Sequence, residues 1–506
     1  MSAPCDVVVV GSGPNGLAAA VLCAAAGLSV TVLEAEPEPG GGCRTQHLDL
    51  GVPLMHDVCS AVHPMAVASP FFAQFDLEAR GVRFGHPDIS YAHPLDGRPA
   101  ALAYRDLSRA VGALEEHSER DARLYRRIMT PLVDNVDVVR GLGLSDVRSV
   151  PSAALSPRGI AAAVTLAGRA LQLGTPLWDK NTDAPACGAM LTGVGAHANT
   201  PIPSLAGAAT ALLLGTLAHS HGWPIPVGGS KAITDALTAD LAARGATVAC
   251  DVRIESAEDL PPARAYLFDT APWTLTKVFG DRLSPRYRRA IRRFTPNNGG
   301  VAKVDFALSE PVPWSDPRIG QAGTVHLGGT RAQMARAETE TSKGRLSQTP
   351  MMLLSQPTVV DPTRIGPGGH SPLWSYAHVP NGSTRDITEI AISQIERFAP
   401  GFRDVVVGSR CIPASEMSSH NANYVGGDIA AGHVSLYRII ARPVPRWDPY
   451  RTPLPNVYLC SASTPPGPGV HGMPGVHAAR RLLRSRFGID GVPDIGPPAS
   501  LRSGDP

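Results

Sequence analysis

The first 34 residues contain a strand–turn–helix–strand pattern that few folds can satisfy. Residues 6–10 form a run rich in valine, typical of a strand buried on both faces. A GxGxxG motif follows at residues 11–16, and an Ala- and Leu-rich segment of helical length ends at Gly27. A second apolar run, residues 28–33, leads directly to Glu34. This order predicts a parallel βαβ unit of the Rossmann type.

Each glycine of the motif has a separate physical role. Gly11 permits the tight turn from strand to helix, Gly13 lets the backbone approach a pyrophosphate, and Gly16 lets the helix pack against the strand. The N-terminus of the helix that follows presents free N–H groups and the positive end of the helix dipole to the phosphates, and Pro14 and Asn15 within the motif are further candidate contacts. The motif therefore predicts a site for the diphosphate of a dinucleotide.

The residues after the second strand favour FAD as that dinucleotide. Glu34 can accept hydrogen bonds from a ribose diol and would repel a 2′-phosphate, so FAD or NAD is preferred to NADP. Residues 39–45 read PGGGCRT, and this glycine loop can approach a second phosphate or a flavin edge, whereas the arginine can pair with phosphate. The alternative is an ordinary surface loop. The candidate contacts in this loop are Gly41, Gly42, Arg44 and Thr45.

These segments resemble a known family. GSGPNGLAAA and LEAEPEPGGGCRT are similar to the start of the phytoene desaturase-like FAD-dependent oxidoreductases, which belong to the glutathione-reductase-like FAD superfamily together with the flavin amine oxidases. The branch that the chain resembles holds carotenoid ketolase-like proteins and the pyridine nucleotide-disulphide oxidoreductase domain-containing protein 2 group. The resemblance covers residues 5 to about 490. It implies an α/β fold, with a Rossmann-type FAD-binding domain and an inserted mixed α+β substrate domain.

The middle of the chain is expected to leave the α/β layer and return to it. Residues 76–224 read as a mixed or largely helical insertion, with helices predicted over 106–127, 157–173 and the apolar run 204–219. A glycine pair, a helix and two strands, 246–250 and 252–256, then lead back, and the resemblance places Val252 on the adenine side. The predicted division is an FAD-binding domain over 1–75, 225–275 and 405–490, a substrate domain over 76–224 and 276–404, and a disordered tail over 491–506.

A second signature lies near the carboxy terminus. Residues 456–461 predict a short strand, followed by a Gly/Pro loop, HGMPG and an Ala-rich helix. A helix N-terminus near flavin N1 would stabilise the anionic reduced ring. The resemblance assigns this unit to the ribityl chain and the ring, although CSAS replaces the acidic residue that many members carry. The candidate contacts are Ser463, Gly472, Met473 and Val476.

The predicted function is that of an FAD-dependent oxidoreductase. A hydride would pass from an apolar, polyene- or isoprenoid-like substrate to flavin N5, and oxygen or a quinone would reoxidise the flavin as a diffusible acceptor. Candidate bases are His420 in EMSSHNANYVGGDIAAG, His471, and Lys303, which resembles a lysine of flavin amine oxidases. Ordinary loop histidines and a solvated strand lysine are the competing interpretations. The alternative functions are a flavin amine oxidase-type enzyme, which needs an aromatic cage, and a flavin-binding partner protein without turnover.

Composition excludes several other classes. A net charge of +2 gives no field for coating nucleic acid. The eight cysteines form no CxxC pair and no metal-spaced cluster, so no metal is expected. The N-terminus does not read as a signal peptide, and the longest apolar run is too short to span a bilayer. A cytoplasmic location is expected, with peripheral lipid contact through Arg480, Arg481, Arg484 and Arg486 as an open alternative. The oligomeric state is left open.

Overall fold

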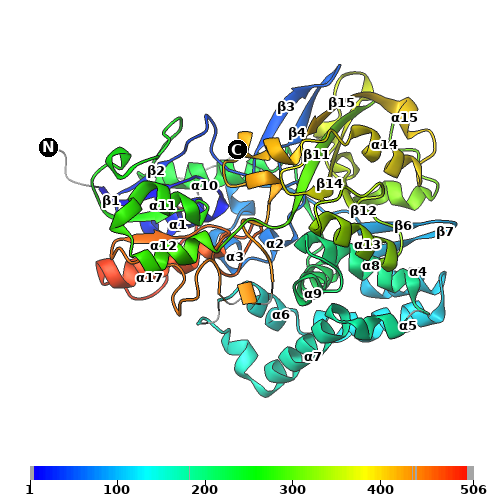
Figure 1. Cartoon of the computed structure of the whole chain (residues 1–506), viewed down its shortest axis with the longest axis horizontal. Coiled ribbons are helices and arrows are strands. Elements are labelled where there is room, and N and C mark those ends of the chain that lie inside the picture. The colour runs from blue at the N-terminus through cyan, green and yellow to red at the C-terminus, as the bar shows by residue number, and fades with distance from the viewer. Residues whose placement is uncertain (1–4, 147, 182, 436, 439–440, 499–506) are drawn as a thin grey trace.

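The chain forms two large β-sheets with helices packed around each, in a computed structural model that describes residues 5–498 apart from 147, 182, 436 and 439–440. Figure 1 shows the two sheets side by side, with a group of helices below the second sheet. The glycine motif and the carboxy-terminal signature both belong to the first sheet and its helices. The site lies where the two halves meet.

The first sheet is parallel and carries the dinucleotide motif. Its strand order is β16-β10-β1-β2-β9, and every neighbouring pair is parallel. The β1–β2 pairing sets Val9 opposite Val32, and both side chains are fully buried, as expected for a sheet covered on both faces. The Rossmann-like α/β fold is therefore present. The strand bounds are β1 Cys5–Val10, β2 Val30–Leu33, β9 Thr247–Ala249, β10 Ala263–Phe268 and β16 Val457–Leu459.

Helices from distant parts of the chain cover this sheet. One face packs with Val7 and Val9 against α1 (Pro14–Ala25), α10 (Lys231–Ala243) and α17 (Met473–Leu482). The other face packs against α11 (Pro272–Phe279) and α12 (Pro285–Arg292). Because α1 and α17 share one core, the two ends of the chain fold as a single unit.

The second sheet is mixed and draws its strands from both predicted insertions. Its order is β15-β11-β14-β13-β12-β6-β7, antiparallel except for the β12–β6 pair. The predicted FAD segment starting at residue 405 is wrong at that boundary, because β15 pairs with β11 and extends the second sheet. The bounds are β6 Ile89–Leu95, β7 Arg98–Tyr104, β11 Gly299–Leu308, β12 Ala322–Leu327, β13 Met352–Ser355, β14 Ser371–Pro380 and β15 Val406–Ile412.

One face of the second sheet is covered by the helical insertion. Tyr91, Trp374 and Tyr376 pack on this face in a core that includes side chains from several of these helices. The predicted single helix over 106–127 is two helices, because Ser118 caps the second one and its hydroxyl accepts from the Asp121 N–H at 3.0 Å. The helices are α4 Leu107–Glu115, α5 Glu119–Val133, α6 Val136–Gly143, α7 Pro157–Gly174, α8 Pro185–Gly195 and α9 Leu205–Ser220.

Smaller elements complete the fold. β3 pairs with β4, and β5 pairs with β8. Helix α14 packs on the second face of the mixed sheet, with α15 beside it, and α13 adjoins α8. The bounds are β3 Thr45–Asp49, β4 Pro53–Asp57, β5 Phe84–Gly85, β8 Ile225–Pro226, α2 Pro64–Val67, α3 Pro70–Phe75, α13 Arg331–Ser342, α14 Thr388–Glu396 and α15 Phe402–Val405.

Two further sequence predictions need correction. Residues 252–256 are predicted as a strand but do not form one. Their backbone approaches the end of β2, where the Val252 N–H donates to the Glu34 carbonyl at 2.8 Å. The predicted disordered tail is packed in its first part, because Ile495 is buried and its carbonyl accepts from Arg80. The rest of that tail, residues 499–506, lies outside the described residues.

Candidate flavin and substrate cavity

A cavity of about 980 Å³ runs between the dinucleotide motif and the helical insertion. At one end it is lined by the strand ends of the parallel sheet, including Ser12, Glu34 and Asp269. At the other end it is lined by apolar side chains of α6, α7 and α9, among them Leu142, Leu166 and Leu213. Such a volume and such a mixture of walls are typical of a site for a large organic ligand.

The cavity brings together residues that sequence analysis placed far apart. The predicted residues that line it are Gly11, Gly13, Pro14, Asn15, Glu34, Gly41, Gly42, Val252, His420 and Ser463. The predicted residues outside this lining are Gly16, Arg44, Thr45, Lys303, His471, Gly472, Met473 and Val476. Most of the second group lies one layer behind the wall and fixes the position of the first.

The glycine motif is packed too tightly for side chains. Gly11 has φ +96°, and a Cβ on Gly16 would lie 2.3 Å from the Gly11 carbonyl oxygen. A Cβ on Gly41 would meet the Cα of Gly13 at 3.2 Å, so the glycine loop lies against the motif. Two backbone segments therefore meet without side chains, which leaves their N–H groups accessible to a diphosphate.

Glu34 is held in place by the motif itself. One carboxylate oxygen accepts hydrogen bonds from the backbone N–H, at 2.8 Å, and the hydroxyl of Ser12, and the other accepts from the Glu36 N–H at 3.0 Å. The side chain is buried on the cavity wall. A fixed carboxylate at the end of β2 is the arrangement that recognises a ribose diol.

Asp269 is an acidic neighbour of the motif that sequence analysis missed. It directly follows β10, and its carboxylate accepts a hydrogen bond from the Gly16 N–H at 2.8 Å. Burial raises the pKa of Asp269 to about 7, with Glu34 raising it further and the Gly16 hydrogen bond opposing the shift. The signal was available, because an aspartate directly after a buried parallel strand lies at the edge where ligands bind.

The carboxy-terminal helix supports the motif from behind. A Cβ on Gly475 would lie 1.9 Å from the Asn15 carbonyl oxygen, so α17 and α1 cross in direct contact. Gly472 caps α17 with φ +70° and packs against Ala18 and Phe71. Met473 and Val476 are buried in this shared core. Their predicted role at the flavin ring remains a prediction, and the neighbouring cavity wall is formed by Gly469 and Val470.

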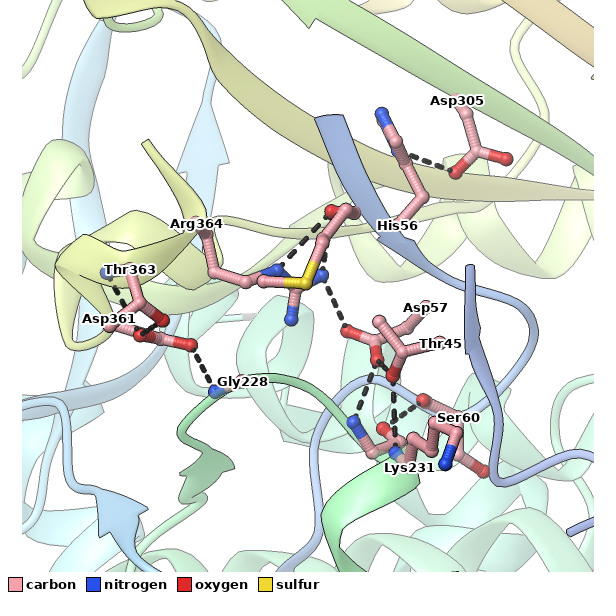
Figure 2. A network of polar contacts seen from close by, with 12 residues as sticks. Thr45, His56, Asp57, Ser60, Gly228, Lys231, Asp305, Asp361, Thr363 and Arg364 are labelled. Carbon is pink, nitrogen blue, oxygen red and sulfur yellow. Dashed lines mark hydrogen bonds and ion pairs between the residues drawn. The ribbon is translucent and has the colours of Figure 1, made fainter. Parts of the chain in front are cut away.

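Arg44 and Thr45 fasten the glycine loop to other parts of the chain. The Arg44 guanidinium donates to the carbonyl oxygens of Gly41, at 2.8 Å, and His420. Thr45 donates to Asp57 at 2.8 Å and accepts from the Lys231 N–H at 3.1 Å. Figure 2 shows Asp57 linking this threonine to Arg364. These contacts position the loop, in addition to any contact that Arg44 makes with phosphate.

Lys303 is buried, so the interpretation as a solvated strand lysine is wrong. Its ammonium pairs with Asp305, two residues along β11, and Asp305 lies 3.3 Å from the imidazole of His56. Burial acts to raise the pKa of Asp305, but Lys303 and His56 hold it below its usual range. The lysine is therefore committed to an ion pair, and its Nζ lies 6.0 Å from the centroid of the Trp374 ring.

The two histidines differ in their surroundings. His420 lines the cavity, and neither ring nitrogen has a partner among the described residues. His471 lies behind the wall, where its Nδ1 accepts from the Met473 N–H at 3.2 Å. Burial lowers the pKa of each to about 4, with Arg44 and Lys303 contributing at His420. Both imidazoles are neutral at pH 7, and His420 alone of these two faces the ligand space.

Three further wall residues were missed. Trp374 and Tyr376 alternate along β14 and therefore share a face, with their rings 5.2 Å apart at an interplanar angle of 86°. Arg442 lines the cavity, is buried, and donates to the carbonyls of Ala430, Ala431 and Ser463. Burial lowers the pKa of Arg442 to about 10, against the opposing effect of Asp428. The period-two pattern of LWSYAH could have identified the aromatic pair, whereas the arginine depends on long-range contacts.

The cysteines on the cavity wall are poor nucleophiles. Cys43 and Cys59 line the cavity as free thiols. Burial raises the pKa of both, so they are protonated and poorly nucleophilic. Among the described residues, no cluster of His, Cys, Asp and Glu side chains has the arrangement of a metal site. Within the same residues, none of the helices combines the length and the hydrophobicity needed to cross a bilayer.

Comparisons with known proteins agree with this geometry at the level of fold. Residues 9–75 match the NAD(P)-binding Rossmann-like domain. The rat "Pyridine nucleotide-disulfide oxidoreductase domain-containing protein 2" is 24% identical over 549 residues, which cover 95% of this chain and 93% of the relative. The hydroxyneurosporene desaturase of Rhodobacter capsulatus is 59% identical over 44 residues, 9% of each chain. A putrescine oxidase structure aligns with a TM-score of 0.59 and 16% identity, over 96% of this chain and 99% of that one.

These likenesses support the general class and leave the branch open. The chain resembles the domain-containing protein 2 group over nearly its whole length, but its likeness to a desaturase is confined to a short segment. The carotenoid ketolase placement remains a prediction. The residues also fit FAD, because a side-chain-free backbone cradle, a fixed ribose carboxylate and a buried arginine line one continuous cavity. FAD is thus the cofactor supported by fold, site and comparisons alike.

Proposed function

We propose that this chain is an FAD-dependent oxidoreductase that dehydrogenates an apolar, isoprenoid-like substrate. The observation that carries this proposal is the continuity of the dinucleotide site with an apolar chamber built from α6, α7 and α9. Of the described residues on the helical side of that wall, Asp146 is the one carboxylate, and it is paired with Arg481. Such a chamber favours a hydrocarbon over a cation.

Different residues of this chain would bind the cofactor, orient the substrate and accept a proton. The glycine motif, Glu34 and the glycine loop would hold the FAD, which supplies a hydride acceptor when bound. Leu142, Leu166 and Leu213 would exclude water and orient the chain of the substrate. His420 is neutral and faces the cavity, so its ring could accept a proton from the substrate carbon next to the oxidised one.

An amine oxidase is the second candidate, favoured by the perpendicular Trp374–Tyr376 pair on the cavity wall. Such rings could flank an amine as an aromatic cage. The likeness to a putrescine oxidase supports this reading as well. The scarcity of carboxylates on the helical side of the wall argues against a diamine.

Anaerobic reduction of the bound flavin tests the two candidates directly. Polyene or terpene hydrocarbons in detergent should remove the visible oxidised flavin band, whereas alkylamines should not. Leu166→Trp, which fills the chamber, should slow this reduction by about tenfold or more. Gly168→Ala is the matched control, because an added Cβ there meets no atom within 4 Å. Reduction by amines alone would replace this proposal with the second candidate.

A further inference from the structure

Three polar side chains lie in one row across the mixed sheet. Thr324 of β12 is opposite Ser355 of β13, and Ser355 is opposite Trp374 of β14. Residues directly opposite each other in antiparallel strands project to the same face, with Cβ atoms about 5 Å apart. The face is the one that the helical insertion covers, because Trp374 packs in the core shared with those helices. We call these three residues the β12–β14 row.

Each member of the row has a buried polar group without a protein partner. The hydroxyls of Thr324 and Ser355 and the indole N–H of Trp374 form no hydrogen bond within the described residues. Thr324 is 3% exposed, Ser355 0% and Trp374 9%. By contrast, Ser375, the next residue on β14, faces the other way and donates to the Val304 carbonyl at 2.7 Å. Because a buried polar group without a partner costs free energy, three of them side by side indicate a ligand that supplies one.

The row lies on the wall of the cavity, on the side of the helical insertion. All three of its residues line the cavity. Thr324 is also paired with Tyr91 of β6, whose hydroxyl lies 3.4 Å from that of Tyr125 on α5. The Tyr91 ring lies 4.9 Å from the ring of Trp223, which is another residue of the wall. The row therefore belongs to the chamber, whereas the glycine motif belongs to the parallel sheet.

The chemistry of these groups selects a neutral oxygen atom. An indole N–H can only donate a hydrogen bond, whereas a hydroxyl donates or accepts, so a ligand atom that serves all three must be an acceptor. An ammonium group is excluded on this ground, because it has no lone pair. A carboxylate would be buried without a counter-ion, since Lys303 pairs with Asp305, which is opposite Trp374 on β11.

We propose that the β12–β14 row binds a neutral oxygen of the substrate, which is then an isoprenoid-like chain that carries a carbonyl, hydroxyl or ether group. The Trp374 N–H and one or both hydroxyls would donate to this oxygen, and the apolar walls would hold the hydrocarbon part. Such an anchor would fix which carbon of the chain faces the flavin. The inference rests on the proposed function for the identity of the ligand as substrate, but binding at the row can be measured without turnover.

A matched pair of saturated probes, methyl tridecyl ketone and pentadecane, tests the row in the holoenzyme. Equilibrium dialysis at one detergent concentration gives the Kd of each probe, and the ratio of the two values is compared between variants, so that partitioning into detergent cancels. The native protein should favour the ketone. The double substitution Thr324→Val and Ser355→Ala should reduce this preference by about tenfold, and Trp374→Phe should reduce it by about threefold or more.

Ser375→Ala is the matched control, because it removes a buried hydroxyl of the same sheet from the opposite face. The preference for the ketone should be unchanged in this variant, although its melting temperature should fall with the lost hydrogen bond. The double variant should melt no lower than the native protein, because the hydroxyls that it removes have no protein partner. A normal flavin content would show that each variant is folded.

The remaining outcomes separate the row from the proposed function. An equal preference in the native protein and the double variant would overturn the proposal. The ring carbonyls of the flavin offer the same acceptor chemistry, so a double variant that loses FAD affinity but keeps its preference would assign the row to the cofactor and overturn the proposal as well. If the preference falls as predicted but no isoprenoid reduces the flavin, the oxygen site stands and the proposed function fails. If isoprenoids reduce the flavin while the preference is unaffected by the double substitution, the proposed function stands and the oxygen site fails.

Discussion

The dinucleotide end of the cavity is formed mainly by backbone, whereas the chamber end is formed by apolar side chains. The first consists of backbone: Gly11, Gly16 and Gly475 stand where a Cβ would lie 1.9–2.7 Å from a carbonyl oxygen. The second consists of aliphatic side chains on α6, α7 and α9, whose exact identities matter less than their volume. The difference suggests that one end fixes the cofactor and the other is free to vary with the substrate.

The largest predicted effect is at the crossing of α1 and α17. Gly475→Ala places a methyl group 1.9 Å from the Asn15 carbonyl oxygen, and the helices must separate. We expect a loss of about 1–3 kcal/mol of stability and of most bound FAD. Thermal unfolding and flavin content of the purified protein measure both. Gly168→Ala is the control at the chamber end. An equal loss of stability and of bound FAD in this variant would contradict the proposed difference between the two ends of the cavity.

A smaller effect on FAD binding is expected at the buried arginine between the two regions. Arg442→Met removes the donor to the carbonyls of Ala430, Ala431 and Ser463, at a cost of about 1–3 kcal/mol. The variant also removes a cation from the cavity wall, so the midpoint potential of bound flavin should become more negative. Arg442→Lys should recover part of the potential. An unchanged potential in both variants would place the arginine away from the flavin.

Asp269 gives the dinucleotide end a dependence on pH. Because the pKa of Asp269 is raised to about 7, the folded protein holds this proton below that pH and releases it above. The ionised carboxylate, with Glu34 nearby at the end of β2, would repel a diphosphate. FAD affinity should therefore fall by several fold as pH rises from 6 to 8, and should vary less in Asp269→Asn.

The same proton also affects the stability of the apoprotein. Between the ordinary pKa of an aspartate and about 7, the folded state binds more protons at Asp269 than the unfolded state. This contribution to stability is complete below the unfolded pKa and is lost as pH rises toward 7. The difference between the native protein and Asp269→Asn in denaturant unfolding should follow that trend, and a difference independent of pH would refute the assignment.

The smallest dependence on pH is predicted for His420. Its pKa of about 4 keeps the ring neutral through the physiological range, so the rate of flavin reduction should show no step from this group between pH 5 and 8. His420→Gln should slow reduction by about tenfold if the ring accepts a proton, with FAD content unchanged. A variant as fast as the native protein would show that the chamber needs no base at this position.

The parts of the fold that sequence predicted are those specified by contiguous residues. The glycine motif and Glu34 lie within one short segment, so their spacing predicted a dinucleotide site, whereas the role predicted for the terminal strand–loop–helix came from the family resemblance. Lys303 was misjudged because its environment depends on His56 and on strands far away in sequence, although Asp305 at the next inward position of β11 was a visible partner. β15 was assigned to the wrong sheet for the same reason.

The residues of the cavity wall could likewise be predicted only where neighbouring residues in the sequence specify them. Asp269 could have been found from its position after a buried strand, and Trp374 with Tyr376 from their alternation. The position of Arg442 and the place of α7 in the chamber wall could not be predicted from sequence. Both depend on contacts between segments tens or hundreds of residues apart.

Both ends of this chain are predicted to close around one FAD, while the helical insertion supplies the chamber. The most direct measurement is a titration of the apoprotein with FAD, followed by the visible spectrum and the heat of binding. We predict a stoichiometry of one FAD per chain for the native protein and for Gly168→Ala, and little binding for Gly475→Ala. A native protein that binds no FAD, or a Gly475→Ala variant that binds it as tightly as the native chain, would contradict the account.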